Sequence, residues 1–552
     1  MKFLLSTLLA LLTAALLLHP APARAGLSTQ AAPEPLLAPI GGGYNPETIA
    51  GLSEVLVQRS RGEPLRILVL PLAYPTNPLS VAEKDRAEYL KTADERRAGI
   101  EAACLQAAPQ GCRAELAPVL TRADADAAGV ADYLAEPPSA VFILGGDPLV
   151  ASQVLSGTAL ERALEQAYRQ GTLISGTGAG GLLQSRTLLA GYRANYDAGN
   201  ALEFGAVETG FPGLSFGAPQ VIIDQGFTLR SRAARLLNAI SRPGAPHIGI
   251  GLENETGVLL SAAGDIRAAF GAYTATILDA ETYHAAQGVQ YNGERSLISL
   301  RNVLVQVLAP GAGAYDLRTR RHSLAGAPAR LERSYSGLQT PAGAGPLLLC
   351  AAPFDAPAGR QALTRFANWS GGQQAHQLVV TAGYADAQQA RQAAEALQAL
   401  LPTASTALAA PARGALPAID PDVSGVILSI GETAAVNPAV LQNLAAAWRS
   451  GLPLLVDRGA IPLTGQYFAG SLPAAPESPE AARRAMQGLL AGALETRPGL
   501  GLLGVNLVVR VQEDNRWGDL YGLAYQFPAL LALGLPDGAA LEVTAAGPQA
   551  LG

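Results

Sequence analysis

The chain has 552 residues, of which 49% are hydrophobic and 15% are charged, and its formal net charge is −6. Such a length accommodates roughly two to four domains, and the composition excludes a disordered, collagen-like or coiled-coil protein. An acidic chain without a basic block has little to neutralise phosphates, which argues against a nucleic-acid partner.

The N-terminus has the pattern of an export signal. A lysine is followed by an apolar run over residues 3–18 and then by Ala-Arg-Ala at 23–25, which is a small-residue cleavage site. The run is shorter than the ~20 residues of a membrane-spanning helix. We therefore expect residues 1–25 to be a signal peptide. The mature protein is then exported to the periplasm, the cell surface or the medium, without a transmembrane segment; a retained membrane anchor is the alternative.

The first half contains short apolar runs that predict buried strands. Each run is apolar on both faces, ends in glycine or aspartate and leads into a further element, as expected of a parallel sheet covered by helices. In chain order they read LLAPIGGG (36–43), SAVFILGGD (139–147), RQGTLISGTGAGG (169–181), PQVIIDQGF (219–227) and GIGLENETGVLL (249–260).

The cysteines suggest a disulfide and no metal site. Cys104 and Cys112 are eight residues apart, and export permits a bond between them, although two free thiols fit the spacing equally well. Cys350 stands in the apolar run PLLLCAAP and is interpreted as a buried thiol. No cysteine and histidine spacing resembles a zinc site, so we expect no metal and no other cofactor.

The second half repeats the order of the first. Residues 346–384 match 36–74, and four later segments follow in the same order as their counterparts. These are 424–432, 449–460, 505–513 and 533–543. Chance similarity between α/β domains is the alternative, but the conserved order favours duplication. The sequence predicts two tandem, doubly wound, mostly parallel α/β domains over 26–340 and 341–552, joined by the Pro/Gly-rich segment 336–345.

Ligands of open parallel sheets bind at the carboxyl ends of the strands, which is where the glycine-rich turns of the first domain lie. The turn GTGAGG (176–181) has the glycine spacing of a nucleophile elbow, G-x-S-x-G. The second domain is more divergent, because its counterpart VDRGA (456–460) has charged residues in that turn. The acidic run 512–522 is interpreted as a solvated loop.

Five motifs in order resemble the cyanophycinases and their relatives in the S51 family of serine peptidases. The family motifs GGG, GGDQ, GTSAGA, DQHF and GIG(I/L)DE are matched here by GGG (41–43), GGDP (145–148), GTGAGG (176–181), DQGF (224–227) and GIGLEN (249–254). The resemblance covers about residues 40–320. It implies a flavodoxin-like, class I glutamine-amidotransferase-like fold and a serine-type peptidase ancestry.

The chain departs from the family at the catalytic positions. Gly178 stands in place of the serine nucleophile and Gly226 in place of the histidine base. Glu253 is the expected counterpart of the triad acid, or Asn254 if the register shifts by one. In a Ser-His-acid mechanism the serine attacks and the histidine takes its proton, and glycine has no side chain for either role.

A binding pocket can persist after its catalytic residues are lost. The resemblance implies a small acidic peptide or β-aspartyl-arginine as the ligand, and the residues that would hold it surround the glycine turns. They are Gly42, Gly43, Gly145, Gly146, Asp147, Thr177, Ala179, Asp224, Gln225, Arg230 and Arg232. The plainer alternative is that these glycines serve only the backbone turns.

Three functions follow from these observations. The sequence favours an exported, non-catalytic protein for binding or assembly, because both the nucleophile and the base are missing. The second is an active exopeptidase with an atypical nucleophile, such as a shifted site near His247, which we interpret instead as a structural histidine. The third is a structural envelope component whose domains supply surfaces and self-associate.

Overall fold

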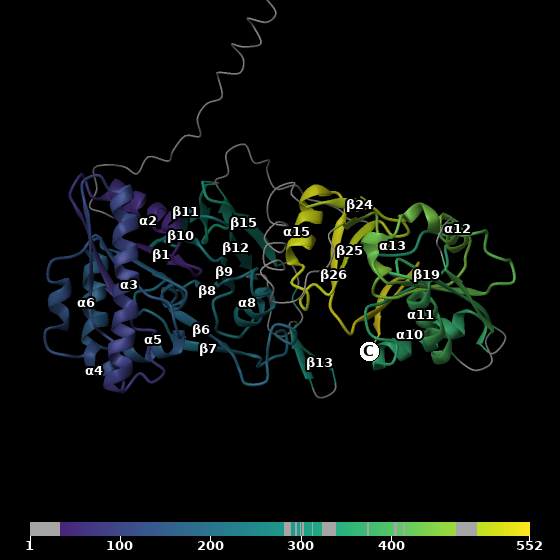
Figure 1. Cartoon of the computed structure of the whole chain (residues 1–552), viewed down its shortest axis with the longest axis horizontal. Coiled ribbons are helices and arrows are strands. Elements are labelled where there is room, and N and C mark those ends of the chain that lie inside the picture. The colour runs from purple at the N-terminus through teal and green to yellow at the C-terminus, as the bar shows by residue number, and fades with distance from the viewer. Residues whose placement is uncertain are drawn as a thin grey trace, which may run out of the picture.

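The computed structural model describes residues 34–280, 289–292, 295–298, 300, 303–311, 313–322, 338–372, 375–401, 406–411, 415–470 and 494–551. The expected signal peptide lies outside these residues. The two halves of the chain form two α/β bodies side by side (Figure 1). In the described part of the chain, no helix is both long enough and apolar enough to cross a bilayer.

The first domain is built on a nine-stranded sheet in the order β17-β16-β11-β10-β1-β5-β4-β2-β3. Its strands are β1 (Leu36–Ile40), β2 (Leu65–Leu70), β3 (Cys112–Leu116), β4 (Ala140–Ile143), β5 (Leu173–Thr177), β10 (Thr256–Ser261), β11 (Asp265–Gly271), β16 (Tyr315–Asp316) and β17 (Arg321–His322). The five strands β1 to β5 pair in parallel, and the remaining pairs are antiparallel.

Helices cover both faces of this sheet, because side chains alternate along each buried strand. Leu36 and Ile40 of β1 pack in one hydrophobic core with residues of the helices α2 and α3, whereas Leu37 packs in the opposite core with α5 and α6. The helices are α2 (Pro46–Arg59), α3 (Glu83–Ala107), α4 (Arg122–Ala125), α5 (Pro148–Leu155), α6 (Ala159–Arg169) and α7 (Ala179–Leu182), with the 3-10 helix η1 (Val130–Leu134).

A smaller four-stranded sheet, in the order β15-β12-β9-β8, completes the first domain. It consists of β8 (Val221–Gln225), β9 (Ile248–Leu252), β12 (Ala275–Asp279) and β15 (Leu304–Leu308), and α8 (Ala233–Ile240) packs against it. Two hairpins are formed by β6 (Thr187–Tyr192) with β7 (Val207–Pro212) and by β13 (Val289–Asn292) with β14 (Arg295–Ile298).

The second domain repeats this topology. Its seven-stranded sheet has the order β20-β19-β21-β22-β18-β27-β28, which matches β3-β2-β4-β5-β1-β10-β11 strand for strand. The strands are β18 (Leu347–Cys350), β19 (His376–Ala382), β20 (Thr406–Pro411), β21 (Gly425–Ile430), β22 (Leu454–Val456), β27 (Ala540–Thr544) and β28 (Gly547–Leu551). The prediction of two tandem doubly wound α/β domains is confirmed.

Smaller elements of the two domains also correspond. The strands β25 (Val505–Val509) and β26 (Leu531–Leu535) pair in parallel as β8 and β9 do, and β23 (Tyr467–Ala469) pairs with β24 (Thr496–Pro498) as β6 does with β7. The helices are α10 (Pro357–Trp369), α11 (Ala387–Leu400), α12 (Gln442–Arg449), α13 (Ile461–Thr464) and α15 (Trp517–Gln526), with η3 (Thr433–Ala435) and η4 (Pro438–Leu441).

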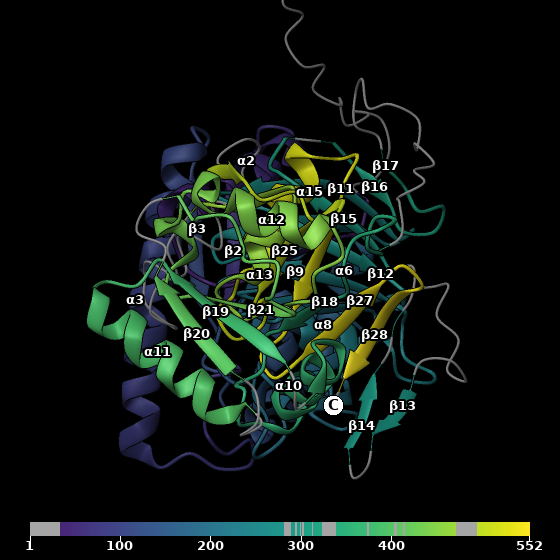
Figure 2. The same ribbon diagram turned by 90° about the vertical axis from the view of Figure 1, so that its right-hand side faces the viewer.

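In Figure 2, which faces the second domain, α10 and α11 lie on one side of the strands and α12 lies on the other. Leu348 of β18 accordingly packs with α10 and α11, and its neighbour Leu349 packs with α12. Leu338 already belongs to this domain's core, and the Thr340 N–H donates to the Thr544 carbonyl at 3.1 Å. The segment that joins the domains is therefore packed on the second domain before residue 341.

The cysteines occupy the places that their sequence context suggested. A disulfide joins Cys104, near the end of α3, to Cys112, at the start of β3. Cys350 is a buried free thiol, and burial raises its pKa to about 12.

Candidate functional site

The turn after β5 keeps the shape of a nucleophile elbow without a nucleophile. Gly178 has φ +55° and ψ −117°, between the end of β5 and the first turn of α7. This left-handed conformation is strained for any residue with a Cβ atom, as it is in the strand-to-helix turn of a nucleophile elbow. A Cβ atom at Gly178 would lie 2.8 Å from Gln225 Oε1, so Gln225 faces the position where a serine side chain would begin.

The position of the base is next to this turn. Gly226 directly follows β8 with φ +51°, and its N–H donates to the Gly41 carbonyl at 3.1 Å. A Cβ atom at Gly226 would lie 3.2 Å from Asn254 Oδ1. The structure therefore brings Gln225, and with it the neighbouring Gly226, close to Gly178, although the two turns are far apart in the sequence.

The two candidates for the acid position, Glu253 and Asn254, point in different directions. Glu253 is buried, and its carboxylate accepts hydrogen bonds from the Thr228 and Leu229 N–H groups at 2.8 and 3.4 Å. Burial raises the Glu253 pKa to about 7. Because Asn254 and not Glu253 is directed at Gly226, the geometry favours the alternative register, which places an amide where the acid would orient a histidine.

Two of the predicted pocket residues, Asp224 and Arg232, make their polar contacts within the first domain. Asp224 is completely buried and forms a bidentate ion pair with Arg235 of α8, with Arg235 Nε 3.0 Å from Asp224 Oδ2. Arg232 lies 3.6 Å from the same carboxylate and donates to the Gln225 carbonyl at 2.6 Å. Burial lowers the Arg232 pKa to about 10. By contrast, Arg230 of the same loop is exposed.

The other glycine turns are explained by close packing against backbone or side-chain atoms. A Cβ atom at Gly146 would lie 2.0 Å from the Ala73 carbonyl, and one at Gly42 would lie 2.7 Å from Asn254 Oδ1. Asp147 caps α5 by accepting the Leu149 and Val150 N–H groups at 2.8 and 3.1 Å. These contacts give each residue a structural role in the turn it occupies.

The remaining predicted residues line the same turns. The Thr177 hydroxyl donates to the Gly43 carbonyl at 2.8 Å, and the Gly145 N–H donates to the Tyr44 hydroxyl at 2.9 Å. Ala179 is fully buried in the first turn of α7. His247, which anchored the alternative of a shifted site, is partly buried, and its Nδ1 lies 2.7 Å from the Ile240 carbonyl.

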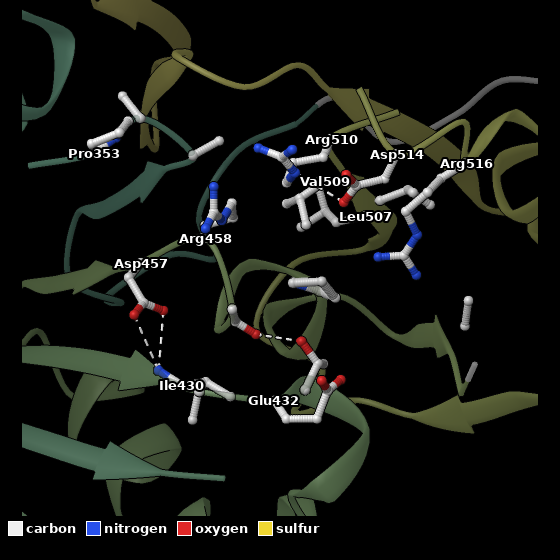
Figure 3. Close-up of a pocket in the computed structure, with 18 of the residues that line it drawn as sticks. Pro353, Ile430, Glu432, Asp457, Arg458, Leu507, Val509, Arg510, Asp514 and Arg516 are labelled. Atoms are coloured by element: carbon white, nitrogen blue, oxygen red, sulfur yellow. Dashed lines mark hydrogen bonds and ion pairs between the residues drawn. The ribbon is translucent and has the colours of Figure 1, made fainter. Parts of the chain in front are cut away.

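The second domain contains a cavity of about 500 Å³ at the carboxyl ends of its strands (Figure 3). This is the position that the glycine turns occupy in the first domain, and the sequence reasoning did not select it. Its charged lining residues are Glu432, Asp457, Arg458, Arg510, Asp514 and Arg516. The signal that marks it in the sequence is the charged pair Asp457-Arg458, which directly follows a buried strand.

Asp457 is held at the edge of this cavity by a dense set of donors. Its carboxylate accepts from the Ser429 hydroxyl at 2.6 Å and from the Ile430 and Ala460 N–H groups at 3.1 and 3.0 Å. The Tyr384 hydroxyl lies 2.7 Å from Ser429 Oγ. Burial raises the Asp457 pKa to about 6. Within the described residues, no group of three or more His, Cys, Asp or Glu side chains is arranged to hold a metal ion.

The loop after β25 shows how far the two sites have diverged. The backbone has positive φ at Arg510 (+54°) and Asn515 (+51°), as it has at Gly226 and Ser231 in the loop after β8. Arg510 is therefore the counterpart of Gly226. The sequence-based pairing of 219–227 with 505–513 is therefore wrong by two residues.

Comparisons with known proteins find cyanophycinases among the proteins similar to this chain. The chain is 30% identical to a cyanophycinase of Synechococcus elongatus over 184 residues, which are 33% of this chain and 53% of that protein. It is 29% identical to a cyanophycinase of Geminocystis herdmanii (strain PCC 6308) over 184 residues, which are 33% of this chain and 64% of that protein. The chain thus spans about half to two thirds of the length of these curated relatives. No family model matches the chain.

Among solved structures, a peptidase from an acI-B1 Actinobacterium matches with 16% identity and a TM-score of 0.34, over 49% of this chain and 100% of that chain. A putative peptidase E from Listeria monocytogenes EGD-e matches with 12% identity and a TM-score of 0.26, over 41% and 95% of the two chains. The resemblance to the cyanophycinases and the S51 peptidase family, first seen in the five motifs, is confirmed by the curated relatives.

Proposed function

We propose that this chain is an exported cyanophycinase-like protein that binds its ligand or an envelope partner without hydrolysing it. The observation that carries the proposal is the pair Gly178 and Gly226, which occupy the nucleophile and base positions with φ of +55° and +51°. Neither residue has a side chain that can attack a carbonyl or accept a proton. What such a site retains is backbone geometry, which supports binding and not turnover.

The neighbouring hydroxyl groups support the same conclusion. Ser175 Oγ is buried and donates to the Ala38 carbonyl at 2.9 Å, and Thr177 Oγ1 donates to Gly43. A nucleophile needs a base within hydrogen-bond reach, and both hydroxyls instead point at backbone acceptors. By resemblance, the ligand of the first domain is a short acidic peptide or β-aspartyl-arginine, with the exposed Arg230 as its cationic contact.

Hydrolysis tests the proposal directly. The purified protein is incubated with insoluble cyanophycin and with a panel of aspartyl peptides, and released dipeptide is followed over hours. The double variant Gly178→Ser/Gly226→His and the triple variant that adds Asn254→Glu run beside it. Gly62→Ser/Gly244→His is the matched control, because both glycines have positive φ and open space around the position of a Cβ atom.

We expect no turnover by the natural sequence or the control, and the first detectable turnover in the triple variant. The alternative function, an active exopeptidase with an atypical nucleophile, requires turnover by the natural sequence that survives purification. That result would contradict a non-catalytic role. Export is tested separately by sequencing the N-terminus of the processed protein, which should begin at Gly26.

A further inference from the structure

The cavity of the second domain combines charges of opposite sign with an apolar lining. It lies at the carboxyl ends of β18, β19, β21, β22 and β25, where α/β proteins of this type bind ligands. Its volume of about 500 Å³ lies within the usual range for small-molecule sites. The residues of this cavity do not include the glycine turns of the first domain.

Three arginines line this cavity, and acidic residues fix each of them. Arg510 Nε is 2.9 Å from Asp514 and its Nη1 bonds Asp537, while Arg458 Nη1 is 3.3 Å from the other Asp537 oxygen. Arg516 Nε is 2.7 Å from Asp519. A guanidinium has five N–H donors, so these pairs orient the groups and leave further donors for a ligand.

The accessible member of this set is Arg458. Its side chain is 48% exposed, in contrast to 24% for Arg510, which is bound by two carboxylates, and 16% for Arg516. In Figure 3, Arg458, Arg510 and Arg516 are drawn above Glu432. Arg458 therefore offers the planar donor group that recognises a carboxylate.

The opposite side of the cavity is acidic. Glu432 follows β21 and is partly exposed, and its backbone N–H is fixed by the Gly383 carbonyl at 2.9 Å. Asp457 is already occupied by Ser429 and two backbone N–H groups, so Glu432 is the carboxylate better placed to receive a cation. Between these charges the lining is apolar, with Pro353, Ile430, Leu507 and Val509 among its members.

We propose that this cavity binds a short peptide with free termini and apolar side chains. Its carboxylate lies against Arg458, its ammonium group against Glu432, and its side chains against the apolar lining. Charges of opposite sign at the two ends select a zwitterion over a simple anion, because an anion alone would meet Glu432 unfavourably. The proposal goes beyond the proposed function, since it assigns a second ligand site to the other domain.

The test is calorimetric titration of the purified protein with L-alanyl-L-leucine. N-acetyl-L-alanyl-L-leucine removes the ammonium charge, and L-alanyl-L-leucine amide removes the carboxylate. The variants are Arg458→Gln and Glu432→Gln, with Arg391→Gln on the exposed face of α11 as the matched control. Circular dichroism and thermal unfolding confirm that each variant folds as the natural sequence does.

We expect the free dipeptide to bind, and each of Arg458→Gln and Glu432→Gln to raise its Kd by about tenfold, as the loss of one charge-assisted hydrogen bond predicts. Arg391→Gln should leave the Kd unchanged, and both blocked peptides should bind more weakly. Equal affinity for the N-acetyl peptide would overturn recognition of a zwitterion. Absence of binding at millimolar dipeptide, or an unchanged Kd in both folded variants, would overturn the site itself. Neither outcome depends on whether the first domain hydrolyses anything.

Discussion

Ser231 and Asn515 occupy equivalent positions in the two domains, and each bonds the loop that carries the other. Ser231 Oγ donates to the Gln512 carbonyl at 2.8 Å, and Asn515 Nδ2 donates to the Thr228 carbonyl. Each is the sixth residue after its strand, β8 or β25, with φ +51°. Thr228 and Gln512 are equivalent as well, so the contact is reciprocal, as in an isologous dimer interface. Trp517 adds apolar packing against the first domain.

The reciprocal contact predicts that Asn515 couples the two domains. Asn515→Gly removes the amide while tolerating the left-handed backbone, so the change reports the lost hydrogen bond and not strain. We expect the free energy of unfolding in urea to fall by about 1 kcal/mol. The control is Asn195→Gly, which has φ +71° in an exposed loop of the first domain. A loss of similar size in the control would assign the effect to the backbone.

The Asp224–Arg235 ion pair predicts a large stability effect. Arg235→Ala leaves a fully buried carboxylate without its partner, which is expected to lower the free energy of unfolding by about 3 to 5 kcal/mol. Arg230→Ala, in the exposed part of the same loop, should change it by less than about 0.5 kcal/mol. Equilibrium denaturation of the two variants gives the comparison. Equal effects would show that Asp224 is stabilised by other groups.

Glu253 predicts a pH dependence of stability. Burial raises its pKa to about 7 from the ordinary value of 4.5, so the folded state holds a proton that the unfolded chain releases. The free energy of unfolding should therefore fall as pH rises from about 4.5 to about 7, by on the order of 2 to 3 kcal/mol. Glu253→Gln should remove the Glu253 contribution and make this fall shallower, whereas Glu136→Gln, with a side chain 92% exposed, should leave it unchanged. Urea titrations at several pH values measure both slopes.

The disulfide predicts a redox-dependent stability of the first domain. Cys104→Ser/Cys112→Ser removes a bond that closes a loop over a sequence separation of 8 residues. The loop-entropy estimate for such a loop is about 2.5 kcal/mol. Dithiothreitol should reduce the stability of the natural sequence by a similar amount and have no effect on the double variant. Equal sensitivity of both proteins to the reductant would show that the bond is not formed in the folded protein.

The sequence predicted the fold well, because buried parallel strands are marked by continuous apolar runs and by the glycines at their ends. It also predicted that the glycine turns lie at the carboxyl ends of strands, where open parallel sheets bind ligands. It did not predict that Gly178, after β5 of the larger sheet, and Gly226, after β8 of the smaller sheet, lie close together. The choice between Glu253 and Asn254 was not predictable in this way. The two are adjacent and face different ways, and the pattern of the family motif left the register open by one residue.

The internal use of Asp224 and the cavity of the second domain also required the structure. The partner of Asp224 is Arg235, a helix residue whose direction no motif specified. The cavity is assembled from segments that begin near Ala351 and end near Arg516, and none of them has a recognisable catalytic pattern. A site formed by unremarkable residues from many strand ends becomes visible only when the strands are placed side by side.

The repeated strand order also changes what substitution can do to this molecule. In a symmetric dimer of identical chains, every mutation appears on both sides of the interface, and both must tolerate it. Here the two copies share one chain, so each position is inherited and altered separately. An arginine can stand at position 510 with a carboxylate on either side of it, while its counterpart at position 226 is a glycine packed against Asn254. Covalent linkage has freed the two strand-end sites from having to remain the same.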